Sequence, residues 1–389
     1  MPTQRYLIVG GGMTGHAAAA AIREADPEGA IAILSEEPVR PYARPPLSKG
    51  LWLGKPEHSV WLPEVPGTDL HLGRTAVALD PRAREVRDDL GELHRYDRLL
   101  LATGAAPSRL SGDQGRVAYF RTISDYQRLR AIDGRHIAVV GAGFIGSELA
   151  AALAQNGKEV TLLFPEQAIG ARAYPGELAA FVTRTYEQKG VRLLCGERVV
   201  SVAARGEQTA LRTASGKEVV ADAVVAGLGV RPNTALAEAA GIHCDDGVEV
   251  DERLETSARG VFAAGDVARF PCRPLGERIR VEHEDAALTM GRAAGRNMAG
   301  ASETYDHLPF FYSDLFDLGY EAVGRLDARL ETVASWKTPF REGVIYYLEG
   351  DRVRGVLLWG TFGKVDAARR LIAGEPPLRR EALAEAIRQ

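Results

Sequence analysis

Cysteine is scarce in this chain. It has only three in 389 residues, Cys195, Cys244 and Cys272. They are widely spaced and match no metal-binding or disulfide pattern, and the eight histidines show no ligand spacing either. We therefore expect no metal site.

Long apolar runs and runs of one charge are also missing. No stretch of about 18 or more apolar residues occurs, so no membrane-spanning helix is predicted. The formal net charge is −4 without a long basic run, so nucleic acid is not an expected partner. Residues 1–10 lead straight into a strand pattern without a signal or transit peptide, which favours a cytoplasmic location.

What the chain does contain is one strand–turn–helix unit written twice. Residues 6–22 read YLIVGGGMTGHAAAAAI, and residues 137–153 read IAVVGAGFIGSELAAAL. Each has an apolar strand, an alanine-rich helix and the pattern G-x-G-x-x-G, at Gly10, Gly12 and Gly15 and again at Gly141, Gly143 and Gly146. These glycines permit a tight turn and let a pyrophosphate approach the backbone at a helix N-terminus. A lone copy is also compatible with an unliganded α/β domain, but two copies in the same context predict two dinucleotide sites.

Acidic residues follow the next strand of each unit. Glu36 ends AIAILSEE, and Glu166 ends EVTLLFPE slightly beyond the usual position. An acid there can bind the ribose hydroxyls of a dinucleotide and would repel a 2′-phosphate, which favours NADH. Arg172, six residues later, could instead accept that phosphate, so NADPH stays open.

Three buried strands are predicted to end in small residues, which is typical of a ligand crevice. They are LLLATG (Ala102, Thr103 and Gly104), VVAGLG (Gly227 and Gly229) and VFAAGDVA (Gly265 and Asp266). The Asp266 carboxylate could hold a ribityl hydroxyl of a flavin, or it could be an ordinary strand-to-turn aspartate.

The order of these signals predicts an α/β protein with three domains. Residues 1–112 and 251–308 form the first dinucleotide domain, and residues 113–250 form the inserted second one. Residues 309–389 contain strand patterns with turns at Glu342–Gly343 and Gly350–Asp351, followed by helical periodicity over 362–373. This part is predicted to be a small α+β domain.

The chain resembles the FAD- and NAD(P)-binding ferredoxin reductases of the glutathione-reductase structural class, and within it apoptosis-inducing factor and its bacterial relatives. The stretches that carry the resemblance are PYARPPLSKGLW, GFIGSELA, LLFPE, RVEHEDA and FFYSDLFDLGYEAVG. Several lie outside the dinucleotide fingerprint, and the resemblance covers nearly the whole chain. It implies an NAD(P)H-dependent flavoprotein reductase with two Rossmann-like domains.

The resemblance also implies residue roles. FAD would be held by Gly10, Gly12, Met13, Thr14, Gly15, Ser35, Glu36, Arg44, Ala76, Ala102, Thr103, Gly104, Arg121, Gly265, Asp266, His283 and Glu284. The nicotinamide dinucleotide would contact Gly143, Ile145, Glu166, Arg172, Gly229, Glu282 and Glu321. Lys49 would lie beside the flavin ring with Glu148 as its partner, and Phe144 would cover the nicotinamide pocket. Tyr312 stands where the family usually has tryptophan, and it could stack or hydrogen-bond at the flavin edge without the indole.

Hydride transfer from nicotinamide to flavin needs positioning and charge rather than a nucleophile. Lys49 is the candidate cation near the flavin, and a helix that begins near His283 could add its positive end. Each has a plainer reading, as a solvated lysine and a packed histidine, and Glu148 could be an exposed helix acid.

The identity of the electron acceptor is left open. No cysteine precedes Cys195, which excludes disulfide reductases with a redox pair in the first domain. One hypothesis is a reductase for ferredoxin, rubredoxin or a similar small carrier, and a small-molecule acceptor such as a quinone is also possible. The alternative is a redox sensor like apoptosis-inducing factor, a slow NADH oxidase with a long-lived charge-transfer complex. The sequence leaves open whether the protein is a monomer or a homodimer.

Overall fold

The computed structural model describes residues 5–374 and 380–387. The chain forms two compact units, each built from three segments. Unit 1 comprises Met1–Ala43, His58–Ala106 and Arg231–Pro309, and unit 2 comprises Arg44–Glu57, Pro107–Val230 and Phe310–Gln389. The three domains expected from the sequence do not correspond one to one to these two units, and the three-domain division remains a prediction.

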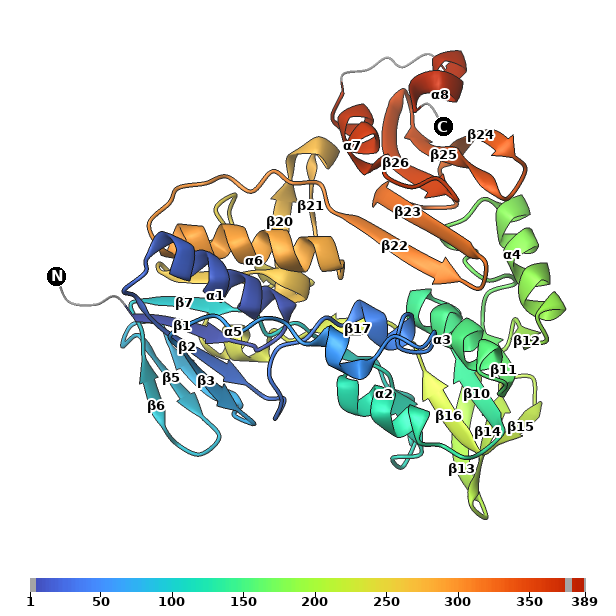
Figure 1. The fold of residues 1–389 in the computed structure, drawn as a ribbon, viewed down its shortest axis with the longest axis horizontal. Coiled ribbons are helices and arrows are strands. Elements are labelled where there is room, and N and C mark those ends of the chain that lie inside the picture. The colour runs from blue at the N-terminus through green and yellow to red at the C-terminus, as the bar shows by residue number, and fades with distance from the viewer. Residues whose placement is uncertain (1–4, 375–379, 388–389) are drawn as a thin grey trace. The chain divides into compact units, whose positions relative to one another are not determined.

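Unit 1 contains one parallel sheet, two small sheets and the helices that flank them (Figure 1). Its elements are β1 (Arg5–Val9), α1 (Met13–Ala25), β2 (Ala30–Ser35), β3 (Thr68–Leu72), β4 (Ala76–Asp80), β5 (Glu85–Asp88), β6 (Leu93–Arg95), β7 (Arg98–Leu101), α5 (Ala235–Ala239), β18 (Val248–Glu249), β19 (Val261–Ala263), η3 (Gly265–Val267), β20 (Ala268–Cys272), η4 (Arg273–Leu275), β21 (Glu277–Ile279) and α6 (Glu284–Met298).

Unit 2 contains a second parallel sheet and two antiparallel ones (Figure 1). Its elements are η1 (Pro45–Ser48), β9 (Val117–Tyr119), α2 (Ile123–Arg130), β10 (His136–Val140), α3 (Phe144–Gln155), β11 (Glu159–Phe164), α4 (Gly176–Gln188), β12 (Arg192–Cys195), β13 (Val199–Arg205), β14 (Gln208–Thr213), β15 (Glu218–Ala221), β16 (Ala223–Ala226), β22 (Phe310–Leu315), β23 (Leu318–Gly324), β24 (Glu331–Thr338), β25 (Glu342–Glu349), β26 (Arg352–Trp359), α7 (Val365–Ala373) and α8 (Arg380–Ala386). The short elements η2 (Glu57–Val60), β8 (Ala105–Pro107) and β17 (Val230–Pro232) lie where the chain passes between units.

The two parallel sheets share the arrangement of four strands and differ in one edge strand. Their orders are β3-β2-β1-β7-β19 and β12-β11-β10-β16-β9, so the strand that precedes each glycine turn is central. From that strand the chain adds two strands on one side and then crosses to the other side, where β19 is the last strand of its sheet but β9 comes before β10. Ligands bind at such a switch point, beyond the carboxyl ends of the strands. The predicted Rossmann-like folds are therefore confirmed.

Close helix packing positions the first glycine turn. Helix α1 lies against α6, and both are rich in alanine and glycine (Figure 1). A Cβ on Gly291 would lie 2.5 Å from Thr14 O, and one on Gly295 would lie 2.5 Å from Ala18 O. Larger side chains there would push the helices apart, because that distance is far inside van der Waals contact.

The C-terminal part of unit 2 has the antiparallel order β22-β23-β26-β25-β24. The small α+β domain is thus confirmed, although one turn differs from the prediction. Strand β25 begins at Glu342, so its turn from β24 lies at residues 339–341 instead of Glu342–Gly343. Phe340 has a φ of 57° there, and a left-handed phenylalanine gives the sequence no recognisable turn signal. Helix α7 begins at Val365, three residues after the predicted start.

Among the residues that the structure describes, no helix combines the length and apolar character needed to cross a membrane.

Candidate functional site

The first glycine turn forms an open cradle in unit 1. Gly10 has a φ of 120°, and a Cβ on it would lie 2.1 Å from Ala102 O. A Cβ on Gly15 would lie 2.0 Å from Gly10 O, so both positions need glycine for close packing. A Cβ on Gly12 would meet no heavy atom within 4 Å. Gly12 is thus open to a ligand at the N-terminus of α1, which fits a bound pyrophosphate.

The second turn repeats this geometry in unit 2. Gly141 has a φ of 96°, and its Cβ would lie 2.4 Å from Gly227 O. A Cβ on Gly146 would lie 1.8 Å from Gly141 O, while one on Gly143 would meet nothing within 4 Å. The second cradle therefore also fits a pyrophosphate, at the N-terminus of α3.

The strand ends of unit 1 bring further predicted residues close to the first turn. Ser35 ends β2 and contacts Gly11, and the exposed Glu36 follows it. A Cβ on Gly265 would lie 2.3 Å from Thr14 Oγ1, so this glycine allows Asp266 to follow beside α1. Strand β19 ends at Ala263, before the predicted strand end at Gly265 and Asp266, and a short 3-10 helix carries these two residues instead.

His283 is the residue immediately before helix α6. The first turn of that helix carries Glu284 and Asp285. Burial lowers the pKa of His283 to about 4, although the charges of Asp266 and Asp285 oppose this shift. The imidazole is therefore neutral near pH 7 in the folded protein.

Lys49 and Glu148 form an ion pair within unit 2. Lys49 Nζ lies 2.8 Å from Glu148 Oε2, and the side chains are 13% and 2% exposed. Lys49 follows η1, and Glu148 lies in the second turn of α3. Glu148 is thus a buried acid rather than a solvated helix residue. A buried charge needs such partners because desolvation is costly.

Two serines that the sequence analysis did not single out complete this cluster. Ser48 Oγ donates to Glu148 Oε2 at 2.6 Å, and Ser313 Oγ donates to Glu148 Oε1 at 2.7 Å. Both lie in quoted stretches, PPLSK and FFYSDL, so only their position in these motifs could have indicated them.

Aromatic residues flank the cluster. The Phe144 ring, at the start of α3, lies 4.9 Å from the Phe311 ring between centroids. Lys49 Nζ lies 5.2 Å from the centroid of Tyr312. Phe144 and Ile145 are 46% and 39% exposed, so they border the second cradle without being enclosed.

Glu166 and Arg172 are bonded to each other. Arg172 Nη2 lies 2.5 Å from Glu166 Oε1, and their side chains are 84% and 24% exposed. The acid thus already pairs with Arg172, the candidate for binding a 2′-phosphate.

The remaining predicted residues lie as follows. In unit 1, Met13 and Ala102 are buried, Thr103 and Gly104 lie in the loop after β7, Ala76 begins β4, and Glu282 Oε1 accepts from Arg280 Nη1 at 2.7 Å. In unit 2, Arg44 Nη1 donates to Arg121 O at 2.8 Å, Gly229 has a φ of 78°, and Glu321 Oε2 accepts from Gly363 N at 3.0 Å. Their contacts with cofactors stay predictions.

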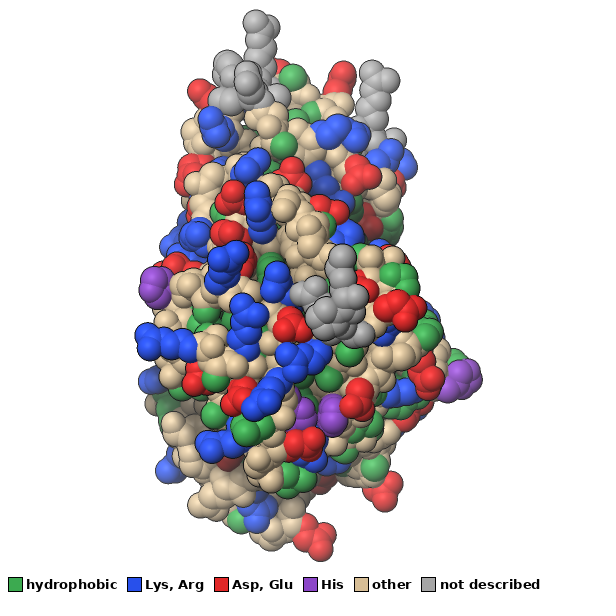
Figure 2. Space-filling view, turned by 90° about the vertical axis from the view of Figure 1, so that its left-hand side faces the viewer, with side chains coloured by type: hydrophobic (Ala, Val, Ile, Leu, Met, Phe, Trp, Pro, Cys, Tyr) green, Lys and Arg blue, Asp and Glu red, His purple; other side chains and the backbone are tan. Residues whose placement is uncertain are grey.

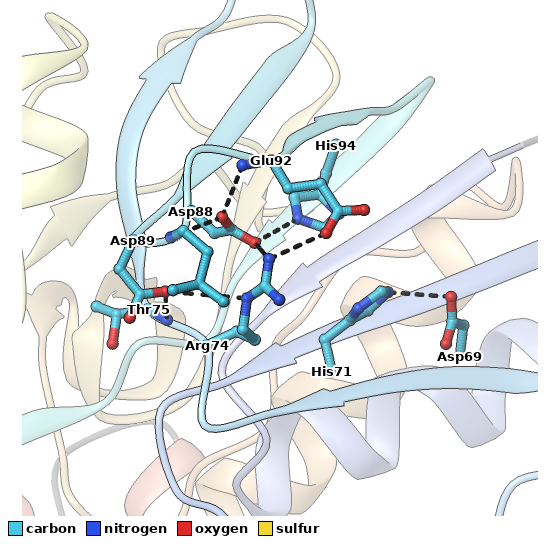
Figure 3. Close-up of polar contacts among 9 residues, drawn as sticks. Asp69, His71, Arg74, Thr75, Asp88, Asp89, Glu92 and His94 are labelled. Atoms are coloured by element: carbon cyan, nitrogen blue, oxygen red, sulfur yellow. Dashed lines mark hydrogen bonds and ion pairs between the residues drawn. The ribbon is translucent and has the colours of Figure 1, made fainter.

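A separate ionic cluster lies in the β4–β6 meander of unit 1 (Figure 3). Asp88, Glu92 and His94 bring potential metal-ligand atoms within 4.8 Å of one another. The Arg74 guanidinium bonds to both carboxylates, and His94 Nε2 lies 2.9 Å from Asp88 Oδ2. Burial disfavours the charged form of Asp88, but hydrogen bonds from His94 and Arg74 outweigh it and hold the pKa far below its usual range. The cluster therefore already has its cation in Arg74.

Comparisons with known proteins agree with this geometry. Residues 4–291 match the family model described as "Pyridine nucleotide-disulphide oxidoreductase", and residues 294–339 and 335–374 match the C-terminal domain of mitochondrion-associated apoptosis-inducing factor. The ferredoxin–NAD(+) reductase component of the anthranilate 1,2-dioxygenase system from Burkholderia cepacia is 35% identical over 96% of this chain and 95% of its own. Apoptosis-inducing factor 1 from Dictyostelium discoideum is 33% identical over 95% of this chain and 78% of its own.

A solved structure extends these matches to the whole fold. The covalent putidaredoxin reductase–putidaredoxin complex contains a chain with a TM-score of 0.91 and 28% identity, covering 98% of this chain and 96% of that one. Two open glycine cradles on equivalent sheets are what a protein needs to bind both FAD and NAD(H). The chain belongs to the pyridine nucleotide-disulphide oxidoreductase family, whose members are NAD(P)H-dependent flavoproteins.

Proposed function

We propose that this protein is an FAD-dependent NADH oxidoreductase that passes electrons to a small carrier of the ferredoxin class. The observation that carries this proposal is the buried Lys49–Glu148 pair beside the second glycine cradle. Glu148 on α3, the helix proposed to bind NADH, holds the Lys49 ammonium, which follows η1, at a fixed position.

The residues of both cradles fit the two dinucleotides. In unit 1, Gly12, Glu36 and Asp266 would hold FAD at its pyrophosphate, ribose and ribityl groups. In unit 2, Gly143 and Glu166 would hold NADH. Bound FAD supplies the redox chemistry, because it accepts a hydride from NADH and can release electrons one at a time. A cation close to the ring favours the reduced, anionic flavin.

NADH is the proposed donor because Glu166 is an acid with Arg172 paired to it. The acid can bind the ribose hydroxyls and repels a 2′-phosphate. Arg172 would have to leave an ion pair before it could accept that phosphate.

A ferredoxin-type acceptor is supported by two of the relatives. One is named as a ferredoxin–NAD(+) reductase component, and another was solved as a complex with putidaredoxin. The face shown in Figure 2 has Lys and Arg side chains interspersed with Asp and Glu, and small separate hydrophobic groups. The cytoplasmic location stays a prediction.

A second candidate function is favoured by the C-terminal domain match and the apoptosis-inducing factor relative. In this alternative, NADH reduces the flavin slowly and the reduced state of the protein is itself the signal.

An anaerobic NADH titration of the purified holoprotein distinguishes the two. Rapid bleaching of the flavin, followed by prompt reoxidation with ferredoxin, supports the reductase. Slow bleaching with a long-wavelength absorbance band that persists in air and ignores ferredoxin supports the sensor. If NADH leaves the flavin oxidised, both functions are wrong.

A further inference from the structure

Three distant segments of unit 2 converge on the carboxylate of Glu148. Ser48 and Lys49 come from η1 and the residue after it, Glu148 from α3, and Ser313 from β22. Glu148 Oε2 accepts from both Ser48 Oγ and Lys49 Nζ, whereas Oε1 accepts from Ser313 Oγ. Each oxygen thus has a donor, as a buried carboxylate requires.

The approach of β22 to α3 follows from the periods of the two elements. Side chains two apart on a strand lie about 6.6 Å apart on one face, and those four apart on a helix lie about 6 Å apart. Phe311 and Ser313 therefore match Phe144 and Glu148, and the ring contact of 4.9 Å and the hydrogen bond of 2.7 Å form together.

The surroundings of Glu148 are poorly solvated. Burial raises the pKa of Tyr174, Tyr186 and Tyr320, and the negative charge of Glu148 raises each of them further. A carboxylate in such surroundings depends on its hydrogen-bond donors for its orientation, because little water is present to replace them.

We infer that Ser313 is a positioning residue, which orients the Glu148 carboxylate and through it fixes the Lys49 ammonium. Ser48 supports the other oxygen of the same group. This inference rests on the proposed function, because it assigns Lys49 a role in reduction of the flavin by NADH. It also makes the C-terminal sheet part of the site, since β22 contributes a residue that no dinucleotide motif contains.

The inference predicts a specific pattern in Ser313→Ala. Oε1 loses its donor, the carboxylate can rotate, and the ammonium is no longer held in one place. The rate constant for flavin reduction by NADH should fall by about tenfold, which is the loss expected for one hydrogen bond to a charged group. The Kd for NADH should stay within about twofold, because Ser313 acts on the charge and not on the dinucleotide. The flavin midpoint potential should become more negative.

Stopped-flow reduction and a spectroelectrochemical titration of the holoprotein measure these quantities. Ser313→Thr keeps the hydroxyl and should restore most of the rate. Ser201→Ala, at an exposed position of β13, is the matched control for loss of a serine hydroxyl on a strand of unit 2. Flavin content and circular dichroism confirm that each variant is folded.

The double variant Glu148→Gln/Ser313→Ala tests whether the serine acts through the acid. If it does, the double variant is no slower than Glu148→Gln, because the second change removes nothing further. If the two losses multiply, or if Ser313→Ala matches the Ser201→Ala control, the inference is wrong while the proposed function stands. If NADH leaves the flavin of the unmodified protein oxidised, the proposed function fails and the inference with it.

Discussion

The two glycine-motif units share a backbone but differ in what their helices carry. In both, the first and third glycines pack against carbonyl oxygens and the second is open. Five residues after the open glycine, however, α1 has Ala17 and α3 has Glu148. Ala17 packs against Gly291 of α6, while Glu148 binds Lys49 and two serines.

The starts of the two helices also differ in exposure. Met13 and Thr14 are buried at the start of α1, whereas Phe144 and Ile145 are largely exposed at the start of α3. This difference indicates that the glycine pattern specifies a dinucleotide cradle in both units. The residues of the helix that follows the pattern specify what each cradle does. We propose that the first cradle retains FAD and that the second exchanges NADH.

The largest expected effect separates the glycines within one motif. Gly146→Ala places a Cβ 1.8 Å from Gly141 O, so we expect a loss of at least about 3 kcal/mol in the free energy of unfolding, or no folded protein. Gly143→Ala should fold normally, because its Cβ meets open space, and should weaken NADH binding instead. Thermal unfolding and NADH titration measure the two variants. Equal stability would show that the glycines do not have these separate roles.

Lys49→Ala tests the role of the Lys49 ammonium, which pairs with Glu148 on the helix of the second glycine motif. It removes the cation and leaves Glu148 buried without it, so flavin reduction by NADH should slow by about 100-fold. Stopped-flow absorbance measures the rate, and Lys55→Ala, at an exposed lysine, is the control. Unchanged reduction kinetics and spectrum would remove Lys49 from the proposed mechanism.

Glu166→Gln sharpens the prediction of donor specificity. It removes the repulsion and frees Arg172, so the ratio of NADPH to NADH efficiency should rise by about tenfold. Single-turnover reduction with each donor, and calorimetry with ADP-ribose and its 2′-phosphate, measure the change. Glu177→Gln on α4 is the control, and an unchanged ratio would mean that donor choice is made elsewhere.

A pH-dependent effect on stability concerns His283 in unit 1. Well above pH 6.5, the ordinary pKa of histidine, the imidazole is neutral in the folded and the unfolded chain. As the pH falls toward 4, the unfolded chain takes up a proton that the folded one refuses, so the free energy of unfolding decreases. We expect a loss of about 2 kcal/mol, less than the full shift implies because the residue is partly exposed. Urea denaturation between about pH 7 and pH 5 should show this slope, and His283→Asn should reduce it.

Much of the fold was predictable because its signals are local. Strand, turn and helix follow each other within residues 6–22 and 137–153, and glycine spacing fixes the turn between them. The turn before β25 was misplaced because Phe340 adopts a left-handed conformation that its residue type does not signal. The end of β19 was extended too far because Gly265 and Asp266 read as strand continuation.

The candidate site was predictable only in part. Glu36, Glu166 and Asp266 stand at strand ends that the sequence marks, and the family resemblance supplied Lys49 and Glu148. Ser48 and Ser313 were missed, since a buried serine has the same sequence appearance as an exposed one. Arg172 follows Glu166 by six residues in the sequence, but the ion pair between them depends on the path of the loop after β11.

The sequence by itself determined that this protein has two dinucleotide cradles and a small C-terminal domain, because each depends on residues close together in the chain. Only the tertiary structure decided that Ser48 and Ser313 join Lys49 at the Glu148 carboxylate and that this carboxylate is buried. The distances between these side chains depend on the packing of η1, α3 and β22. A carboxylate can be buried there because this packing supplies its ion-pair and hydrogen-bond partners, which offset the cost of desolvation.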